Sequence, residues 1–247
     1  MDILGIDIGG TGIKAAIVNT KTGALISKRH RIPTPKPATP EAVTNTIQEI
    51  INHFNWKGPV GCGFPTPLQH GKCLSGGNLH ETWKETSVND IFKNKTGNEF
   101  FVVNDADAAG LAEINFGAGK GIAGVVIIIT IGTGIGSAIF LDGKLLPNTE
   151  FGHVLHSNGK IFEKYAADSV RKSKSLSQKA WGKRLHEYFE HIELLLSPDL
   201  FIIGGGASKK LDKFESRINI KTPIVAAKSE NEAGIIGAAL AAKFHIH

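Results

Sequence analysis

The feature that most constrains the fold is a pattern of strand, glycine turn and strand that occurs twice along the chain. The two copies span residues 4–18 and 125–140. In each copy an apolar run leads into a glycine-rich turn and a second apolar run follows, as expected for two adjacent strands. The turns align without a gap, since Gly10-Thr11-Gly12-Ile13 corresponds to Gly132-Thr133-Gly134-Ile135. A repeated unit of this kind predicts a chain built from two related halves.

The two glycine turns are candidate phosphate-binding loops. Glycine permits positive φ angles and leaves backbone N–H groups uncovered, which suits an anionic ligand, although a tight hairpin would use glycine in the same way. The first copy carries Asp7, whereas the apolar run 125–131 of the second copy contains no carboxylate, so the repeat offers one carboxylate and implies at most one Mg²⁺ site, held through water. If these two glycine turns face each other across a cleft, they would bind a chain of phosphates from both sides. The predicted phosphate ligands are Asp7, Gly9, Gly10, Thr11, Gly12, Lys14, Gly132, Thr133 and Gly134.

A candidate catalytic carboxylate lies in the middle of the sequence. Residues 100–103 are apolar and predict a buried strand, and an Ala-rich segment that begins after Asn104 predicts a helix. Asp105 or Asp107 is placed to cap the first turn of that helix. A carboxylate next to an amide at a strand end is also suited to proton transfer, so capping and catalysis both remain open for Asp105.

Glu150 and His153 are three residues apart and would share one face of a helix or tight turn. Such a pair could hold a metal or hydrogen-bond several hydroxyl groups. A metal needs more ligands, and the nearest further candidate is His156, with no cysteine close by, which favours hydroxyl groups. The polar, glycine-rich segment 71–83, which contains Asn78, could line a small-molecule pocket or be a plain surface loop.

A third glycine turn, Gly204-Gly205-Gly206, follows an apolar run at 199–203. A helix that started near Ala207 would aim its N-terminus at a ligand. The segment 171–184 is rich in lysine and arginine, and it predicts either a solvated helix surface or a track for a polyanion. Residues 232–244 are rich in Ala and Gly and predict a final helix that can pack closely.

Composition sets broad limits on function. The net charge of +5 and the pI of about 9.1 are compatible with an anionic ligand. Cys62 and Cys73 fit no metal motif and are expected to be two buried thiols. The most apolar run, 122–131, is too short to span a bilayer, and no basic-then-apolar leader precedes it. We therefore expect a soluble, intracellular protein without a membrane or nucleic-acid partner.

Four segments resemble those of the ROK family of sugar kinases, within the actin–hexokinase superfamily. They are Gly5–Lys14, Thr34–Pro40, Asn104–Glu113 and Pro147–His153, and the last two are long and specific. The similarity extends over nearly the whole chain. It is strongest to the branch of the family that phosphorylates glucose from inorganic polyphosphate.

This resemblance implies an α/β fold with two actin-like ATPase (ribonuclease H-like) domains that flank a cleft. The smaller N-terminal domain would comprise residues 1–109, completed by a C-terminal helix at about 231–247. The larger domain would comprise residues 110–230. The implied reaction is transfer of a phosphoryl group from polyphosphate, ATP or both to the 6-hydroxyl of glucose, with Mg²⁺ as cofactor.

The resemblance also implies a role for each candidate residue. Asp105 corresponds to the base that takes the proton from the sugar 6-hydroxyl. Gly9 to Thr11 with Lys14, and Gly132 to Gly134, correspond to the two phosphate loops, and Gly204 to Gly206 resembles the loop near an adenosine site. The residues implied to bind the sugar are Asn78, Asn104, Asp105, Glu150, His153 and Glu163.

One departure from the family pattern is clear. Many family members follow the histidine with a cysteine-rich zinc motif, whereas residues 154–160 contain no cysteine, so we predict no structural zinc. Two alternatives stay open: an ATP-dependent kinase for another hexose or an amino sugar, and a non-catalytic sugar sensor. The family further implies a homodimer and a cytoplasmic location.

Overall fold

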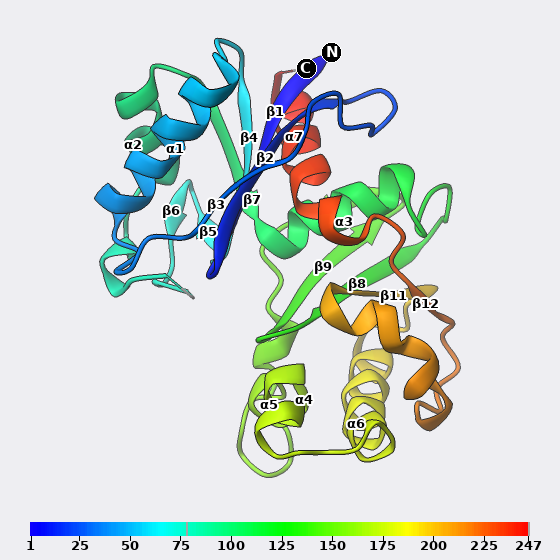
Figure 1. The fold of residues 1–247 in the computed structure, drawn as a ribbon. Helices are drawn as coiled ribbons and strands as arrows, with labels where there is room; N and C mark the ends of the chain where they lie inside the picture. Colours follow the sequence, from blue (N-terminus) through cyan, green and yellow to red (C-terminus); the bar gives the residue numbers. More distant parts are fainter. Residues whose placement is uncertain (78, 247) are drawn as a thin grey trace. The chain divides into compact units, whose positions relative to one another are not determined.

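The computed structural model describes residues 1–77 and 79–246, and the chain forms two compact units (Figure 1). Unit 1 comprises Met1–Ala112 and Glu232–His247, and unit 2 comprises Glu113–Asn231. Each unit is built around one five-stranded sheet with helices packed on it, so the fold is mixed α/β. No helix among the described residues is both long enough and apolar enough to cross a bilayer.

The two sheets have the same strand order and the same strand directions. The order is β3-β2-β1-β4-β7 in unit 1 and β10-β9-β8-β11-β12 in unit 2. In each sheet the first two pairings are antiparallel and the last two are parallel. The predicted repeat is therefore confirmed, and it extends beyond the aligned hairpins to all five strands. The bounds are β1 (Asp2–Gly9), β2 (Gly12–Asn19), β3 (His30–Ile32), β4 (Val60–Phe64), β7 (Phe100–Asn104), β8 (Val125–Ile131), β9 (Ile135–Leu141), β10 (Lys144–Leu146), β11 (Leu200–Gly204) and β12 (Ile224–Ala226), with a separate small ribbon of β5 (Leu68–Gln69) and β6 (Lys72–Cys73).

Helices α1 (Pro40–Phe54) and α2 (Val88–Thr96) share one hydrophobic core with the unit 1 sheet. Thr39 caps helix α1 by accepting a hydrogen bond from the Ala42 backbone N–H at 3.3 Å. Its apolar side chains at 43, 47, 50 and 51 are buried against alternate residues of β1 and β4. Both cysteines are free and buried in this unit, as predicted.

Helix α7 (Ala233–Ile246) packs against β1, β4 and β7. The packing is so close that a Cβ on Gly5 would lie 2.1 Å from the Ile235 carbonyl oxygen, and one on Gly61 would lie 1.8 Å from that of Ala238. Glycine is therefore required at both strand positions. The helix begins beside Asp7, since a Cβ on Gly234 would lie 2.7 Å from the Asp7 carboxyl carbon. The C-terminal helix was predicted as a completion of the N-terminal domain, and it lies in unit 1 with the N-terminal strands.

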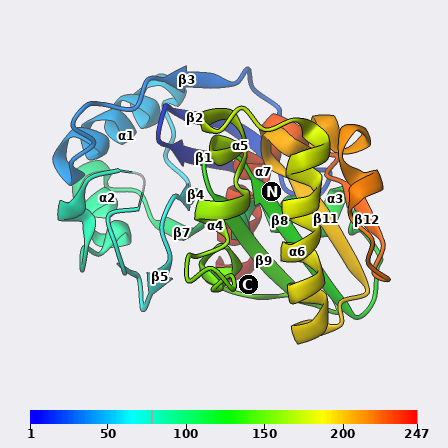
Figure 2. The ribbon, with the colours of Figure 1, turned by 90° about the horizontal axis from the view of Figure 1, so that it is seen from below.

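In unit 2, helix α6 (Gln178–Leu196) lies across β8 and β11 (Figure 2). Trp181, Leu185, Tyr188, Phe189 and Ile192 fill the core between this helix and the sheet. The same core also includes Phe162, Ala166 and Ala167. The remaining helical segments are α3 (Asp105–Phe116), α4 (Glu163–Ala166), α5 (Asp168–Ser173), η1 (Glu81–Trp83), η2 (Phe151–His153), η3 (Gly205–Lys213), η4 (Glu215–Arg217) and η5 (Glu230–Glu232).

Two expectations about backbone geometry were wrong. None of the glycines in the first two turns has a positive φ, so these turns do not need glycine for that reason. The segment expected to start an α-helix near Ala207 is the 3₁₀ segment η3, which is kinked at Lys210. In the third turn a glycine does have a positive φ, since the φ of Gly205 is 69°.

Candidate active site

The central carboxylate, Asp105, is the first residue of α3 and follows directly on β7. Asn104 caps this helix: its Oδ1 accepts hydrogen bonds from the N–H groups of Ala106 at 2.9 Å and Asp107 at 3.3 Å. The prediction that Asp105 or Asp107 would be the cap was therefore wrong, because the cap is the residue just before them, Asn104. Because the amide of Asn104 takes the capping role, the Asp105 carboxylate lies in the first turn, where the helix dipole favours negative charge.

The cap gives Asn104 a structural role that can be separated from sugar binding. Asn104→Asp keeps an oxygen acceptor for the two N–H groups but removes the side-chain NH₂ donor, whereas Asn104→Ala removes both. We expect Asn104→Ala to lower the free energy of unfolding by about 1 kcal/mol and Asn104→Asp to leave it close to the wild-type value. If the NH₂ group binds a sugar hydroxyl, both variants raise the glucose KM. A wild-type KM in Asn104→Asp would restrict this residue to capping.

Two charged residues predicted to bind phosphate, Asp7 and Lys14, lie on the strands that flank the first glycine turn. Lys14 Nζ lies 2.9 Å from Asp7 Oδ2, and the two residues are direct partners in the β1–β2 pairing. Among the described residues, no group of three or more His, Cys, Asp or Glu side chains could hold a metal. A lone carboxylate is nonetheless compatible with Mg²⁺, which commonly binds one or two carboxylates together with water and substrate phosphates. Asp7 is therefore the residue of this turn that fits the ion.

Arg31 lies on the same turn, and sequence reasoning missed it. Its Nη2 donates a hydrogen bond to the Thr11 carbonyl oxygen at 2.8 Å. A Cβ on Gly12 would lie 2.6 Å from the Arg31 guanidinium, so a side chain at position 12 would displace that group. The signal that could have found Arg31 is strand pairing, because β3 places Arg31 directly opposite Lys14.

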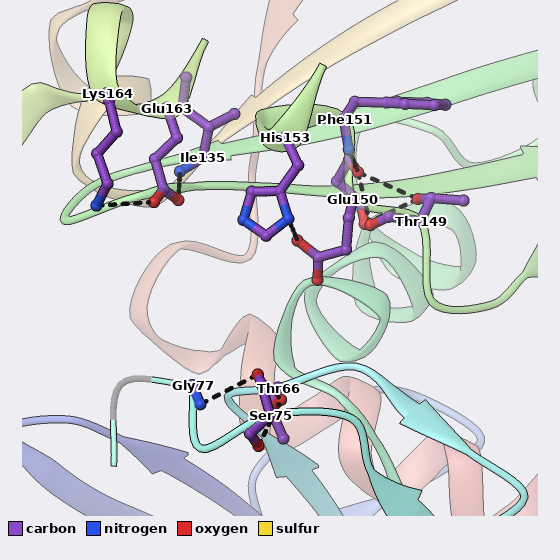
Figure 3. Close-up of polar contacts among 11 residues, drawn as sticks. Thr66, Ser75, Gly77, Ile135, Thr149, Glu150, Phe151, His153, Glu163 and Lys164 are labelled. Atoms are coloured by element: carbon purple, nitrogen blue, oxygen red, sulfur yellow. Dashed lines mark hydrogen bonds and ion pairs between the residues drawn. The ribbon is translucent and has the colours of Figure 1, made fainter. Parts of the chain in front are cut away.

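The second glycine turn is organised around Glu163 (Figure 3). Glu163 Oε2 accepts a hydrogen bond from the Ile135 N–H at 3.1 Å, and Oε1 lies 3.5 Å from Lys164 Nζ. A Cβ on Gly134 would lie 2.2 Å from the same carboxylate, so a side chain at position 134 would displace it. Ser169 donates to the Thr133 carbonyl oxygen at 2.6 Å and completes the support of the turn.

His153 ends η2 and Glu150 is the residue just before it, and their side chains approach each other on one face, as predicted. His153 Nδ1 is 3.9 Å from Glu150 Oε2 (Figure 3). Ser137 holds the segment before them, since its hydroxyl donates to the Thr149 carbonyl oxygen at 2.8 Å and accepts from the Phe151 N–H at 3.0 Å. Burial raises the pKa of Glu150, and the neighbouring Glu163 carboxylate raises it further, while His153 opposes the shift.

The segment between His153 and Glu163 folds into a short hairpin that is anchored to α6. His156 Nε2 donates to Glu187 Oε2 at 2.8 Å, and Tyr165 donates to the other oxygen of Glu187 at 3.1 Å. The Asn158 N–H donates to His156 Nδ1, which assigns the proton of this imidazole to Nε2. His156 is thus committed to anchoring the hairpin whose two ends carry His153 and Glu163.

The basic segment 171–184 separates into two groups. Arg171 and Arg184 are structural: Arg171 pairs with Asp168 at 2.6 Å, and Arg184 donates to the Tyr165 carbonyl oxygen at 2.8 Å while stacking on its ring. Burial favours a raised pKa for Asp168, but the hydrogen bonds from Lys172 and Arg171 outweigh it and lower the pKa. Lys174, Lys179 and Lys183 are exposed, and among the described residues none of them has an acidic partner.

The structure groups the candidate residues within each unit. Asn78 lies outside the described residues. Its neighbouring loop is held by Thr66 and Ser75, with the Gly77 N–H donating to Ser75 Oγ at 3.2 Å (Figure 3). Unit 1 carries Asp7, Gly9, Gly10, Thr11, Gly12, Lys14, Asn104 and Asp105, and unit 2 carries Gly132, Thr133, Gly134, Glu150, His153, Glu163, Gly204, Gly205 and Gly206.

A second residue that sequence reasoning missed, after Arg31, is Glu113, which is 1% exposed. Its oxygens accept hydrogen bonds from the backbone N–H groups of Ala118, Lys228 and Ser229, at 2.6–3.1 Å. Three backbone donors satisfy the carboxylate, so its role is to hold the chain after β12 to the end of α3.

Comparison with known proteins places this geometry in a family. A family model described as the ROK family matches residues 3–164. Polyphosphate glucokinase from Mycobacterium tuberculosis is 46% identical over 238 residues, which cover 96% of this chain and 89% of that protein. The crystal structure of inorganic polyphosphate/ATP-glucomannokinase from Arthrobacter sp. strain KM is 44% identical, with a TM-score of 0.93 over 99% of both chains.

A more distant structure shows the same fold. It is a ROK family glucokinase from Streptomyces griseus in complex with glucose and AMPPNP, with 23% identity and a TM-score of 0.85. The alignment covers 99% of this chain and 100% of that chain. The architecture thus persists where most of the sequence has diverged.

Proposed function

The chain belongs to the ROK family, and on that premise we propose that it is a glucokinase that uses inorganic polyphosphate, ATP or both as phosphoryl donor. The observation that carries the proposal is the position of Asp105, a carboxylate in the first turn of α3 immediately after the Asn104 cap. The names of the Mycobacterium tuberculosis and Arthrobacter relatives, 46% and 44% identical to this chain, support the choice of sugar and donor. A sugar sensor would not need Asp105, Asp7 and the phosphate turns together.

We further propose that the two units are actin-like ATPase domains that flank the substrate cleft, with boundaries near 109 and 231. The identical strand order of the two sheets supports this architecture. The homodimer and the cytoplasmic location implied by the family are proposed on the same ground. Sedimentation of the purified protein and fractionation of the cells that make it would test them.

In the proposed reaction, the 6-hydroxyl oxygen of glucose attacks the terminal phosphorus of the donor. The bond from that phosphorus to the bridging oxygen breaks, and the donor leaves as polyphosphate shortened by one unit or as ADP. Asp105 takes the hydroxyl proton. Asn104, Glu150, His153 and Glu163 hold the other hydroxyl groups, so that positioning supplies much of the rate. Mg²⁺ held near Asp7 would neutralise charge on the phosphate oxygens.

The deciding experiment is glucose 6-phosphate formation with Mg²⁺, with polyphosphate and ATP supplied in separate reactions. Product with either donor supports the proposal, and product with ATP alone would remove polyphosphate from it. Mannose should be assayed beside glucose, because the 44% identical Arthrobacter enzyme is a glucomannokinase. No product from glucose, mannose, fructose or an amino sugar would favour the sensor.

Three exposed lysines, one just after α5 and two in α6, predict a salt effect that is specific to polyphosphate. We propose that Lys174, Lys179 and Lys183 contact the polyphosphate chain beyond the reacting phosphate. By analogy with counterion release from single-stranded nucleic acid, changing all three to Gln should reduce the slope of log KM against log salt by about 2. The KM for ATP, which is a short donor, should change little.

The matched control for this variant is a triple Gln variant of three exposed lysines in unit 1, Lys21, Lys57 and Lys84. It removes the same charge from the protein, so it separates a local contact from a change in net charge. Equal salt slopes for polyphosphate in the two triple variants would count against the lysine track.

A further inference from the structure

The two glycine turns make room for side chains of opposite charge at equivalent positions. Gly12 and Gly134 align in the repeat, and a Cβ on either would collide with a charged group. At Gly12 that group is the Arg31 guanidinium, 2.6 Å away, and at Gly134 it is the Glu163 carboxylate, 2.2 Å away. The turn in unit 2 therefore holds an anion against its backbone, and the turn in unit 1 holds a cation.

The hydrogen bonds have the polarity that these charges require. In unit 2 the Ile135 N–H donates to Glu163, whereas in unit 1 the Thr11 carbonyl oxygen accepts from Arg31. The Glu163 carboxylate disfavours a second anion at the second turn, and the exposed Lys164, whose Nζ lies 3.5 Å away, offsets that charge only in part. The guanidinium beside the first turn attracts an anion, so the first turn is the better place for donor phosphates.

Arg31 belongs to a row of charged residues across three strands. Asp7 pairs with Lys14, and Lys14 pairs with Arg31, so that all three occupy the same face of the sheet. Asp7 neutralises Lys14 at 2.9 Å. No carboxylate among the described residues lies within ion-pair distance of Arg31, which leaves the row with one positive charge that is not compensated.

We propose that Arg31 binds phosphate oxygens of the phosphoryl donor at the first glycine turn. The inference rests on the proposed kinase function and adds a residue to its donor site. A guanidinium has five N–H donors in a planar fork, and the contact with Thr11 uses one of them. The side chain is exposed, so the remaining donors can reach an anion above the turn.

A purely structural role for Arg31 makes a different prediction. The turn has another anchor, because the Thr34 hydroxyl donates to the Gly9 carbonyl oxygen at 2.5 Å. If Arg31 served only to hold the turn, its loss would lower the unfolding temperature and alter the KM values for glucose and donor together. If it binds phosphate, its loss affects the donor alone.

The test compares Arg31→Gln with Arg29→Gln, which removes the same charge from an exposed side chain two residues away. We expect Arg31→Gln to raise the KM for polyphosphate and for ATP about tenfold or more, as for a lost hydrogen bond to a charged group. The glucose KM and the unfolding temperature should stay at wild-type values, and Arg29→Gln should match wild type throughout. Arg31→Lys should recover part of the effect, because it restores the charge without the planar fork.

A second readout does not depend on turnover. Calorimetric titration with tripolyphosphate in the absence of sugar should show about tenfold weaker binding to Arg31→Gln than to Arg29→Gln. Gly12→Ala should weaken binding in the same direction by displacing the guanidinium, and it should add little in the Arg31→Gln background. Equal affinities for tripolyphosphate in Arg31→Gln and Arg29→Gln would overturn the inference.

Failure of the proposed kinase function and failure of the Arg31 proposal give different results. If the wild-type protein forms no sugar phosphate with either donor, the proposed function fails, and the calorimetric comparison then decides whether the turn still binds phosphate through Arg31. If the wild type is active and Arg31→Gln has wild-type KM values for both donors, only the role of Arg31 is rejected.

Discussion

Asp105→Asn is expected to lower kcat for glucose phosphorylation about 10²–10⁴-fold with either donor, the range that general base catalysis supplies. The amide is close in size to the carboxylate but cannot accept the proton of the 6-hydroxyl group. Asn104 would still cap α3 through its own side chain, so the helix start should remain in place. Glucose binding, measured by calorimetry, should change far less than kcat.

The control is Asp90→Asn, which replaces another carboxylate in the first turn of a unit 1 helix, α2, where the side chain is exposed. This variant should retain wild-type kcat and KM. If Asp105→Asn turned over within threefold of Asp90→Asn, Asp105 would not be the base. Equal losses in kcat and in glucose affinity would instead indicate that Asp105 mainly binds the sugar.

The strands and turns that carry the site were predictable because their signals are local. Alternating or continuous apolar runs that end in glycine identify β1, β2, β8 and β9 without tertiary information. The exact pairing register does not follow from the aligned turns, because Gly9 pairs with Gly12 across two residues whereas Ile131 pairs with Ile135 across three. Strand β3 has only three residues and a weak apolar signal, and Arg31 could not be placed at the turn until β3 was paired with β2.

The reasons for individual residues were less predictable than the elements. Asn104, Asp105 and Asp107 all favour helix N-termini, so composition alone did not choose the cap. Gly12 and Gly134 leave room for the ends of distant side chains and have no positive φ, and no local pattern shows such contacts. Segment 171–184 likewise mixes structural arginines with exposed lysines, and only the observed pairs distinguish them.

Glu150→Gln is expected to raise the glucose KM about 10- to 100-fold, as for the loss of a hydrogen bond to a charged group, and to make the protein more stable at neutral pH. Burial raises the pKa of Glu150 above its ordinary value of 4.5, so the native state binds this proton more tightly than the unfolded state. Stability from this group is therefore present below pH 4.5 and is lost as pH rises through the raised pKa.

The neutral amide of Glu150→Gln removes that loss, so the stability gain over wild type should be seen at pH 7 and should vanish in acid. Thermal unfolding from pH 4 to 8 measures it, with Glu190→Gln, an exposed glutamate of unit 2, as the control that should show no such dependence. In the wild type, glucose affinity should fall as pH drops through the raised pKa, because the carboxylate loses its charge. If the glucose KM and the stability profile were both unchanged in Glu150→Gln, the charge of this half-buried carboxylate would serve neither sugar binding nor the proposed pH dependence.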